Sequence, residues 1–198
     1  MFMQNEFFSL RTYPQYHLRS FNLDNPDLIF IMRNIIEQLS IKAPRRRYNH
    51  RCKSIAIEGP KNIGKTQFIF SFLDLINRPF NFMNGKFDFS KKKYNDEFEV
   101  DVYKNFKISY ICDEDIDMRT FCFGCNQDRA NVKYGRGHIR QIIGNKLSIT
   151  LWNPENSFEE QFKKIDKSEQ DYIIPNTIHI KINDDKILYR KNFDNSYR

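Results

Sequence analysis

The chain has 198 residues, which is enough for one α/β domain with a small addition and too few for two full domains. Hydrophobic residues make up 40% of the sequence and aromatic residues 15%, so a sizeable core can form, yet no apolar run is long enough to cross a membrane. The net charge of +7 and the sequence pI near 9.2 favour a polyanionic partner. A lysine-rich solvated surface, as an AT-biased genome produces, is the alternative explanation of that charge. The start of the chain has no signal-peptide pattern, so we expect an intracellular protein.

Residues 1–50 are predicted to form an N-terminal segment that contains one helix. Asn25 suits the N-cap of this helix, and Pro26 suits its first position. Four apolar residues then recur at alternating steps of four and three, the spacing of an interhelical seam: Leu28, Met32, Ile35 and Leu39. The helix either packs on its own domain or joins subunits. A basic linker at residues 43–48 follows it.

A phosphate-loop pattern comes next. An apolar strand pattern at residues 54–58 runs into Gly-x-x-x-x-Gly-Lys-Thr, and a helix-forming run at residues 67–76 follows. This arrangement is typical of nucleotide triphosphatases. The glycines let backbone N–H groups point at a phosphate, Lys65 would neutralise the β- and γ-phosphates, and Thr66 would offer its hydroxyl group to Mg²⁺. We therefore expect a nucleotide to bind to Gly59, Pro60, Lys61, Asn62, Ile63, Gly64, Lys65 and Thr66.

The remaining elements of the core domain, residues 51–183, are expected to alternate between strands and helices. In chain order they are a short strand and turn at 80–89, a charged loop at 90–99, a buried strand at 106–112, a hairpin of 129–134 with 138–143, a buried strand at 147–152, a helix at 157–167 and a strand at 177–182. A polar tail, residues 184–198, ends the chain. The pattern predicts an α/β fold of the P-loop NTPase type, with a parallel sheet, flanking helices and a basic β-hairpin.

Polar residues follow two of the predicted buried strands. Asp113 and Glu114 come directly after the strand at 106–112. Asp113 could hold the metal through water, and Glu114 could orient or deprotonate the attacking water. Whether the pair is Asp113 with Glu114 or Glu114 with Asp115 stays open. Asn153 ends the strand at 147–152, where an amide could contact a γ-phosphate and the water.

The predicted hairpin is rich in basic residues. Between Asp128 and the next strand it carries no acidic residue, but it carries Arg129, Lys133, Arg136, His138, Arg140 and Lys146. Basic side chains near a glycine tip can bind a phosphate backbone without reading bases. An ordinary solvated hairpin is the alternative.

The cysteines give one Cys-x-x-Cys pair and no second pair. Cys112, Cys122 and Cys125 could bind zinc together with His138, but zinc motifs normally combine two paired half-sites. Reduced structural cysteines are the favoured interpretation.

The order of these motifs resembles that of superfamily 3 helicases. More closely, the chain resembles the helicase half of the geminivirus-type replication initiator (Rep), which some bacterial plasmids, such as those of phytoplasmas, also carry. The matching stretches are residues 59–66, 82–89, 111–116, 124–127, 131–135 and 148–155, and the last two are the most specific. The resemblance covers about residues 52–182.

The resemblance implies an AAA+-like ATPase that assembles into rings and moves along single-stranded DNA in rolling-circle replication. It assigns binding of ATP and Mg²⁺ to Lys65, Thr66 and Asp113, hydrolysis to Glu114 and phosphate sensing to Asn153. It assigns DNA contact to the hairpin residues Lys133, Tyr134, Arg136, His138 and Arg140. The expected compartment is the cytoplasm for a bacterial or plasmid-encoded protein and the host nucleus for a viral one.

The chain also departs from the family pattern. It contains neither the His-x-His motif nor the Tyr-x-x-Lys motif of the nicking domain, so we expect no nicking activity. The segment between the acidic motif and Gly124 is shorter than usual, and Arg136 and Arg140 are the candidates for an arginine finger. A non-catalytic initiator fragment that binds DNA or regulates an intact initiator, a superfamily 3 RNA helicase and a P-loop kinase are the alternative functions.

Overall fold

A computed structural model describes residues 18–41, 52–85, 89–105, 129–134, 138–143, 146–183 and 188–189, and in the two segments between 129 and 143 we describe the backbone. Five strands form a parallel sheet in the order β2-β3-β6-β1-β7. Their bounds are β1 Ser54–Glu58, β2 Phe80–Asn84, β3 Val100–Lys104, β6 Leu147–Trp152 and β7 Thr177–Lys181. The predicted parallel α/β fold is confirmed.

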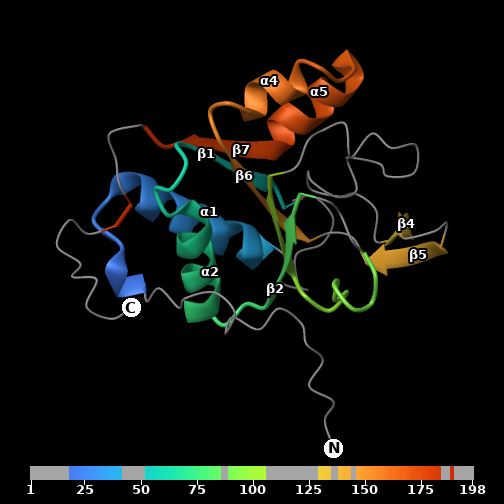
Figure 1. The fold of residues 1–198 in the computed structure, drawn as a ribbon, viewed down its shortest axis with the longest axis horizontal. Coiled ribbons are helices and arrows are strands. Elements are labelled where there is room, and N and C mark those ends of the chain that lie inside the picture. Colours follow the sequence, from blue (N-terminus) through green and yellow to red (C-terminus); the bar gives the residue numbers. More distant parts are fainter. Residues whose placement is uncertain are drawn as a thin grey trace, which may run out of the picture.

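Helices cover both faces of this sheet. Figure 1 shows α1 (Pro26–Ile41) and α2 (Lys65–Leu75) on one side of β1 and β7, and α4 (Phe158–Phe162) and α5 (Lys167–Ile173) on the other. Single 3₁₀ turns lie at Leu18–Ser20 (η2) and Ile174–Asn176 (η4). None of the helices in the described segments has both the length and the apolar character needed to span a bilayer.

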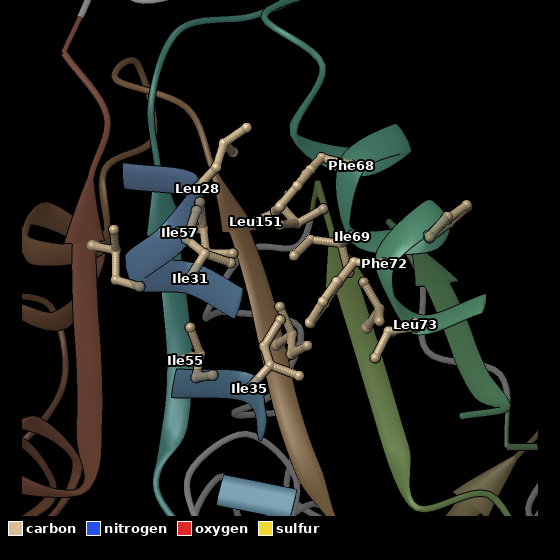
Figure 2. Packing of buried hydrophobic residues seen from close by; sticks show 14 of the residues in the cluster. Leu28, Ile31, Ile35, Ile55, Ile57, Phe68, Ile69, Phe72, Leu73 and Leu151 are labelled. Atoms are coloured by element: carbon tan, nitrogen blue, oxygen red, sulfur yellow. The ribbon is translucent and has the colours of Figure 1, made fainter. Parts of the chain in front are cut away.

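The main core lies between the sheet and the pair α1 and α2. Figure 2 shows side chains of both helices meeting β1 and β6, and its labelled residues are Leu28, Ile31, Ile35, Ile55, Ile57, Phe68, Ile69, Phe72, Leu73 and Leu151. Burying such side chains stabilises a fold by about 1.5–3 kcal/mol each. On the opposite face Trp152 packs edge-on against Phe158 and Phe162 of α4.

Helix α1 begins as its sequence predicts. The side-chain oxygen of Asn25 accepts a hydrogen bond from the backbone N–H of Asp27 at 2.9 Å, and Pro26 is the first helical residue. Two residues of the predicted seam, Leu28 and Ile35, are fully buried, so α1 packs on its own sheet.

Strand β3 was not predicted, because Val-Asp-Val-Tyr-Lys places a charge in the middle of a buried strand. The Asp101 carboxylate is buried, and it accepts hydrogen bonds from Asn81 Nδ2 at 2.8 Å, Tyr94 Oη at 2.8 Å and Tyr103 Oη at 3.2 Å. Burial raises the pKa of Asp101, while the nearby Lys146 ammonium opposes the shift. These partners allow an acidic residue to occupy a central strand.

Two further predictions can be compared with the structure. The hairpin strands are confirmed: β4 (Arg129–Tyr134) and β5 (His138–Ile143) pair antiparallel, with Tyr134 opposite His138. The single helix at 157–167 is wrong, because two N-caps divide the segment. The hydroxyl of Ser157 accepts from the N–H of Glu160 to start α4, and Asp166 is the N-cap of α5. The predicted strand at 106–112 lies outside the described residues.

Candidate nucleotide site

The segment between β1 and α2 forms a tight loop that packs on the rest of the chain. Gly64 has φ +99°, a left-handed conformation, and a Cβ atom built there would lie 2.6 Å from Cε2 of Tyr189. A Cβ on Gly59 would lie 3.0 Å from the Cβ of Ile182. Local packing therefore favours glycine at both positions, and at Gly64 the left-handed backbone conformation favours it as well.

Lys65 is the first residue of α2, and its side chain folds back over the loop between β1 and α2. Its ammonium group donates hydrogen bonds to the carbonyl oxygens of Gly59 at 2.6 Å and Pro60 at 2.5 Å. It also donates to Oδ1 of Asn153, 88 residues further along the chain, at 3.1 Å. Burial, and next the charge of Lys104, lower the pKa of Lys65 to about 8, while Glu155 and Glu58 oppose the shift.

A pocket opens at the carboxyl ends of β1, β3 and β6, the edge of a parallel sheet where ligands usually bind. Its lining residues are Lys61, Asn62, Gly64, Lys65, Thr66, Gln67, Lys104, Asn105, Leu151 and Asn153. The parallel register explains how they meet, because β6 pairs with β1 on one side and with β3 on the other. The structure thus brings together the loop residues and Asn153.

The other predicted loop residues have supporting positions. Gly59 and Pro60 contribute carbonyl oxygens to Lys65, and Ile63 is buried in the core. Lys61 lies at the rim, where its ammonium group forms an ion pair with Glu155 at 2.9 Å. Both side chains of this pair are more than half exposed.

The pocket lining as described leaves the remaining predicted site residues untested. Asp113, Glu114 and Arg136 lie outside the described residues, as do three of the four cysteines. The hairpin residues belong to β4 or β5: Lys133, Tyr134, His138 and Arg140. Within the described segments, no cluster of three or more metal-ligating side chains occurs.

Four residues of the lining were not predicted from the sequence: Gln67, Leu151, Lys104 and Asn105. Lys104 and Asn105 are there because β3 ends at this edge of the sheet, and the valines at positions 100 and 102 were the signal for that strand. Asn105 is fixed in place: its side-chain amide donates to Oδ1 of Asn84 at 2.9 Å, and its φ is +53°. The N–H of Gly85 donates to the carbonyl of Lys104 at 2.9 Å.

A parallel sheet whose inner strand leads into a glycine loop, a lysine and the N-terminus of a helix defines a P-loop α/β protein. No family model matches the chain. Over 158 residues it is 31% identical to a geminivirus-like replication protein of Onion yellows phytoplasma (strain OY-M), an alignment that covers 77% of this chain. The chain is thus similar in sequence to a geminivirus-like replication protein, and it spans 34% of the length of that protein.

Among solved structures, the chain is similar to NtrX from Brucella abortus in complex with ADP. The match covers 79% of this chain and 36% of that one, at 12% identity and a TM-score of 0.40. A likeness at this level supports no conclusion about fold or function.

Proposed function

We propose that this chain is the ATP-binding motor domain of a rolling-circle replication initiator, a DNA helicase or translocase that acts on single-stranded DNA. The observation that carries the proposal is the contact between Lys65 and Asn153 in the pocket at the sheet edge. A lysine for the phosphates and an amide beside it are the parts that a site responding to a γ-phosphate needs. The relationship to a protein named as a replication protein supports the choice of process.

DNA binding is assigned in this proposal to the hairpin of β4 and β5, which lies between β3 and β6 in the chain. The net charge of +7 supports a polyanionic partner. We further propose that the chain assembles as a homo-oligomeric ring around the strand. Sedimentation with and without a non-hydrolysable ATP analogue tests this assembly, and a chain that stays monomeric under both conditions would contradict it.

The motor proposal is tested by ATP hydrolysis of the purified chain with and without single-stranded DNA. We expect turnover that DNA stimulates and that Lys65→Ala abolishes. Lys164→Gln is a suitable control, because it removes one exposed lysine outside the pocket. Equal turnover in Lys65→Ala would show that the hydrolysis does not take place at this pocket, and it would contradict the proposal.

A second function is favoured by Lys104 in the pocket lining. In this alternative the chain binds a nucleotide without hydrolysing it and regulates an intact initiator with which it co-assembles. Nucleotide binding that depends on Lys65, without turnover in the presence of DNA, would select this alternative over the motor.

A further inference from the structure

All three protons of the Lys65 ammonium group are used in hydrogen bonds within the chain. One goes to the carbonyl oxygen of Gly59 at 2.6 Å and one to that of Pro60 at 2.5 Å. The third goes to Oδ1 of Asn153, and at 3.1 Å this contact is the longest. Lys65 must therefore give up at least one of these oxygens before it can donate to a phosphate.

Asn153 is the acceptor that a bound phosphate would replace. It lines the pocket together with Lys65, whereas neither Gly59 nor Pro60 belongs to the described lining. The two carbonyl groups are part of the loop backbone, but the side chain of Asn153 can turn away about its own torsion angles. A phosphate oxygen in the pocket therefore competes with Oδ1 of Asn153 for the same proton of Lys65.

A second contact joins the same two segments of the chain. Asn153 begins a turn, residues 153–156, in which the N–H of Asn156 donates to the carbonyl of Asn153 at 2.9 Å. Glu155, inside this turn, forms the ion pair with Lys61 of the loop between β1 and α2. An exposed ion pair contributes little to stability, so the contact of Asn153 with the buried Lys65 is the main attachment of the turn to the loop.

The turn leads directly into α4, which Figure 1 shows on the face of the sheet opposite α1 and α2. Within α4, Gln161 donates from Nε2 to Oδ1 of Asn156. Trp152, the residue before the turn, packs edge-on against Phe158 and Phe162 of the same helix. Both ends of the turn are therefore in contact with α4.

The end of β6 separates the pocket from α4 by a single residue. Leu151 and Asn153 line the pocket, while Trp152 between them is 2% exposed and packs on α4. Successive side chains of a strand point to opposite faces of the sheet, which explains this division. A displacement of Asn153 in the pocket therefore displaces the residue that supports α4.

We infer that the turn at residues 153–156 is a latch between the pocket and α4, closed by the contact of Asn153 with Lys65 and opened by a nucleoside diphosphate. The β-phosphate replaces the amide oxygen of Asn153 on Lys65, and a diphosphate has no γ-phosphate that could bind Asn153 in exchange. The turn then loses its main attachment to the loop, and α4 loses support. The inference rests on the proposed function only in that the pocket binds a nucleotide, and it requires neither hydrolysis nor DNA.

Trp152 is the only tryptophan of the chain, so its fluorescence reports on this latch. Calorimetry on the intact chain in excess Mg²⁺ measures whether ADP binds, and fluorescence of the same sample measures whether the turn responds. We expect ADP to change the fluorescence, with half of the change at the calorimetric dissociation constant. Amide hydrogen exchange in α4 should become faster by about threefold or more, because a hydrogen bond that supports the turn is lost.

Two variants test the two contacts of the turn. Asn153→Ala should bind ADP about three- to tenfold more tightly, because no contact of Asn153 has to be broken, and its fluorescence should stay constant on titration. Glu155→Gln should tighten binding by only about twofold, as expected for an exposed ion pair. Glu160→Gln is the matched control, since it removes the same charge from an exposed position of α4, and it should behave like the unmodified chain.

The latch is overturned if ADP binds but leaves the fluorescence of Trp152 unchanged or fails to make exchange in α4 faster. It is also overturned if Asn153→Ala binds ADP no more tightly than the unmodified chain. If ATP binds and ADP does not, the latch is overturned while the proposed function stands, and binding of neither would overturn both. The measurements on the unmodified chain decide the inference even if Asn153→Ala does not fold.

Discussion

The titration of Lys65 links its burial to nucleotide binding. In the free protein the pKa of Lys65 is about 8, because burial and Lys104 disfavour its charge. A bound phosphate favours the charged form, so the pKa rises in the complex. Below pH 8 the lysine is charged in both states and affinity should stay constant. Above pH 8 binding must take up a proton, so affinity should fall by up to about tenfold per pH unit.

Dissociation constants measured between about pH 6.5 and 9.5 would check this expectation. In Lys65→Arg the guanidinium keeps its charge throughout the range, so any remaining affinity should be independent of pH. Removing the charge of Lys104 should move the fall to higher pH, since that charge lowers the pKa of Lys65. An equal fall in Lys65→Arg would assign the titration to another group.

Gly64 and Gly85 allow a test of why the loop needs glycine. Both have positive φ, +99° and +79°, but a Cβ on Gly85 would lie 4.0 Å from its nearest neighbour, the carbonyl oxygen of Asn105. Gly85→Ala should cost about 1 kcal/mol for the backbone conformation alone. Gly64→Ala should cost about 1–3 kcal/mol more, because its Cβ would overlap the ring of Tyr189.

Urea unfolding of the two variants measures this difference. Measured in a Tyr189→Ala background, which takes account of the lost stacking on Phe21, Gly64→Ala should cost no more than Gly85→Ala, because the overlapping ring is gone. If both glycine variants are equally destabilised, the contact with Tyr189 does not constrain the loop.

At the scale of elements, β3 depends on the buried Asp101 and its donors. In Asp101→Asn an amide replaces one acceptor oxygen, so at least one of the hydrogen bonds from Asn81, Tyr94 and Tyr103 is lost. Lys146 also loses a nearby negative charge. We expect unfolding free energy to fall by about 2–4 kcal/mol. Asp171→Asn is the control, since it breaks only an exposed pair with Lys167 and should cost less than about 0.5 kcal/mol. Equal stabilities of the two variants would show that the buried network does not stabilise the strand.

The hairpin of β4 and β5 is the element to which we assign DNA contact. Replacing Lys133 and Arg136 with alanine should weaken single-strand binding at low salt and flatten its salt dependence by about 0.7 in slope for each lost phosphate contact. The double variant Lys91→Ala, Lys92→Ala removes two exposed lysines from a loop and serves as the charge-matched control. Unchanged affinity in the hairpin variant, or an equal loss in the control, would remove the hairpin from the DNA site.

Elements with local signals were predictable from the sequence, and those that depend on distant partners were not. The strand, loop and helix around Lys65 follow one another within 22 residues, Ser54 to Leu75, so their pattern is complete in the sequence. Strand β3 and its end at Lys104 were missed, because the burial of Asp101 makes sense only beside Asn81, Tyr94 and Lys146. Lys65 and Asn153 were each predicted at the nucleotide site, whereas their direct contact and the presence of Lys104 in the same pocket came from the structure.

At the scale of the molecule, two segments far apart in sequence meet beside the phosphate loop. The ring of Phe21 stacks on Tyr189 with centroids 4.9 Å apart, and the N–H of Asn22 donates to the carbonyl of Leu188 at 2.8 Å. Phe21 also packs edge-on against Phe68 of α2, at 5.3 Å between centroids. A core domain cut at residues 51 and 183 would therefore lack both segments that pack beside the loop.

This junction would have a mechanical consequence in the motor that we propose, which pulls on a strand under load. Tension that reaches the fold through Phe21 and Tyr189 pulls these two segments apart before it can act on the parallel sheet. Because the ring of Tyr189 rests against Gly64, we expect the loop between β1 and α2 to lose its packing first. In a force-extension experiment on the intact chain, the force at which a bound nucleotide dissociates should therefore be lower than the force at which the sheet unfolds.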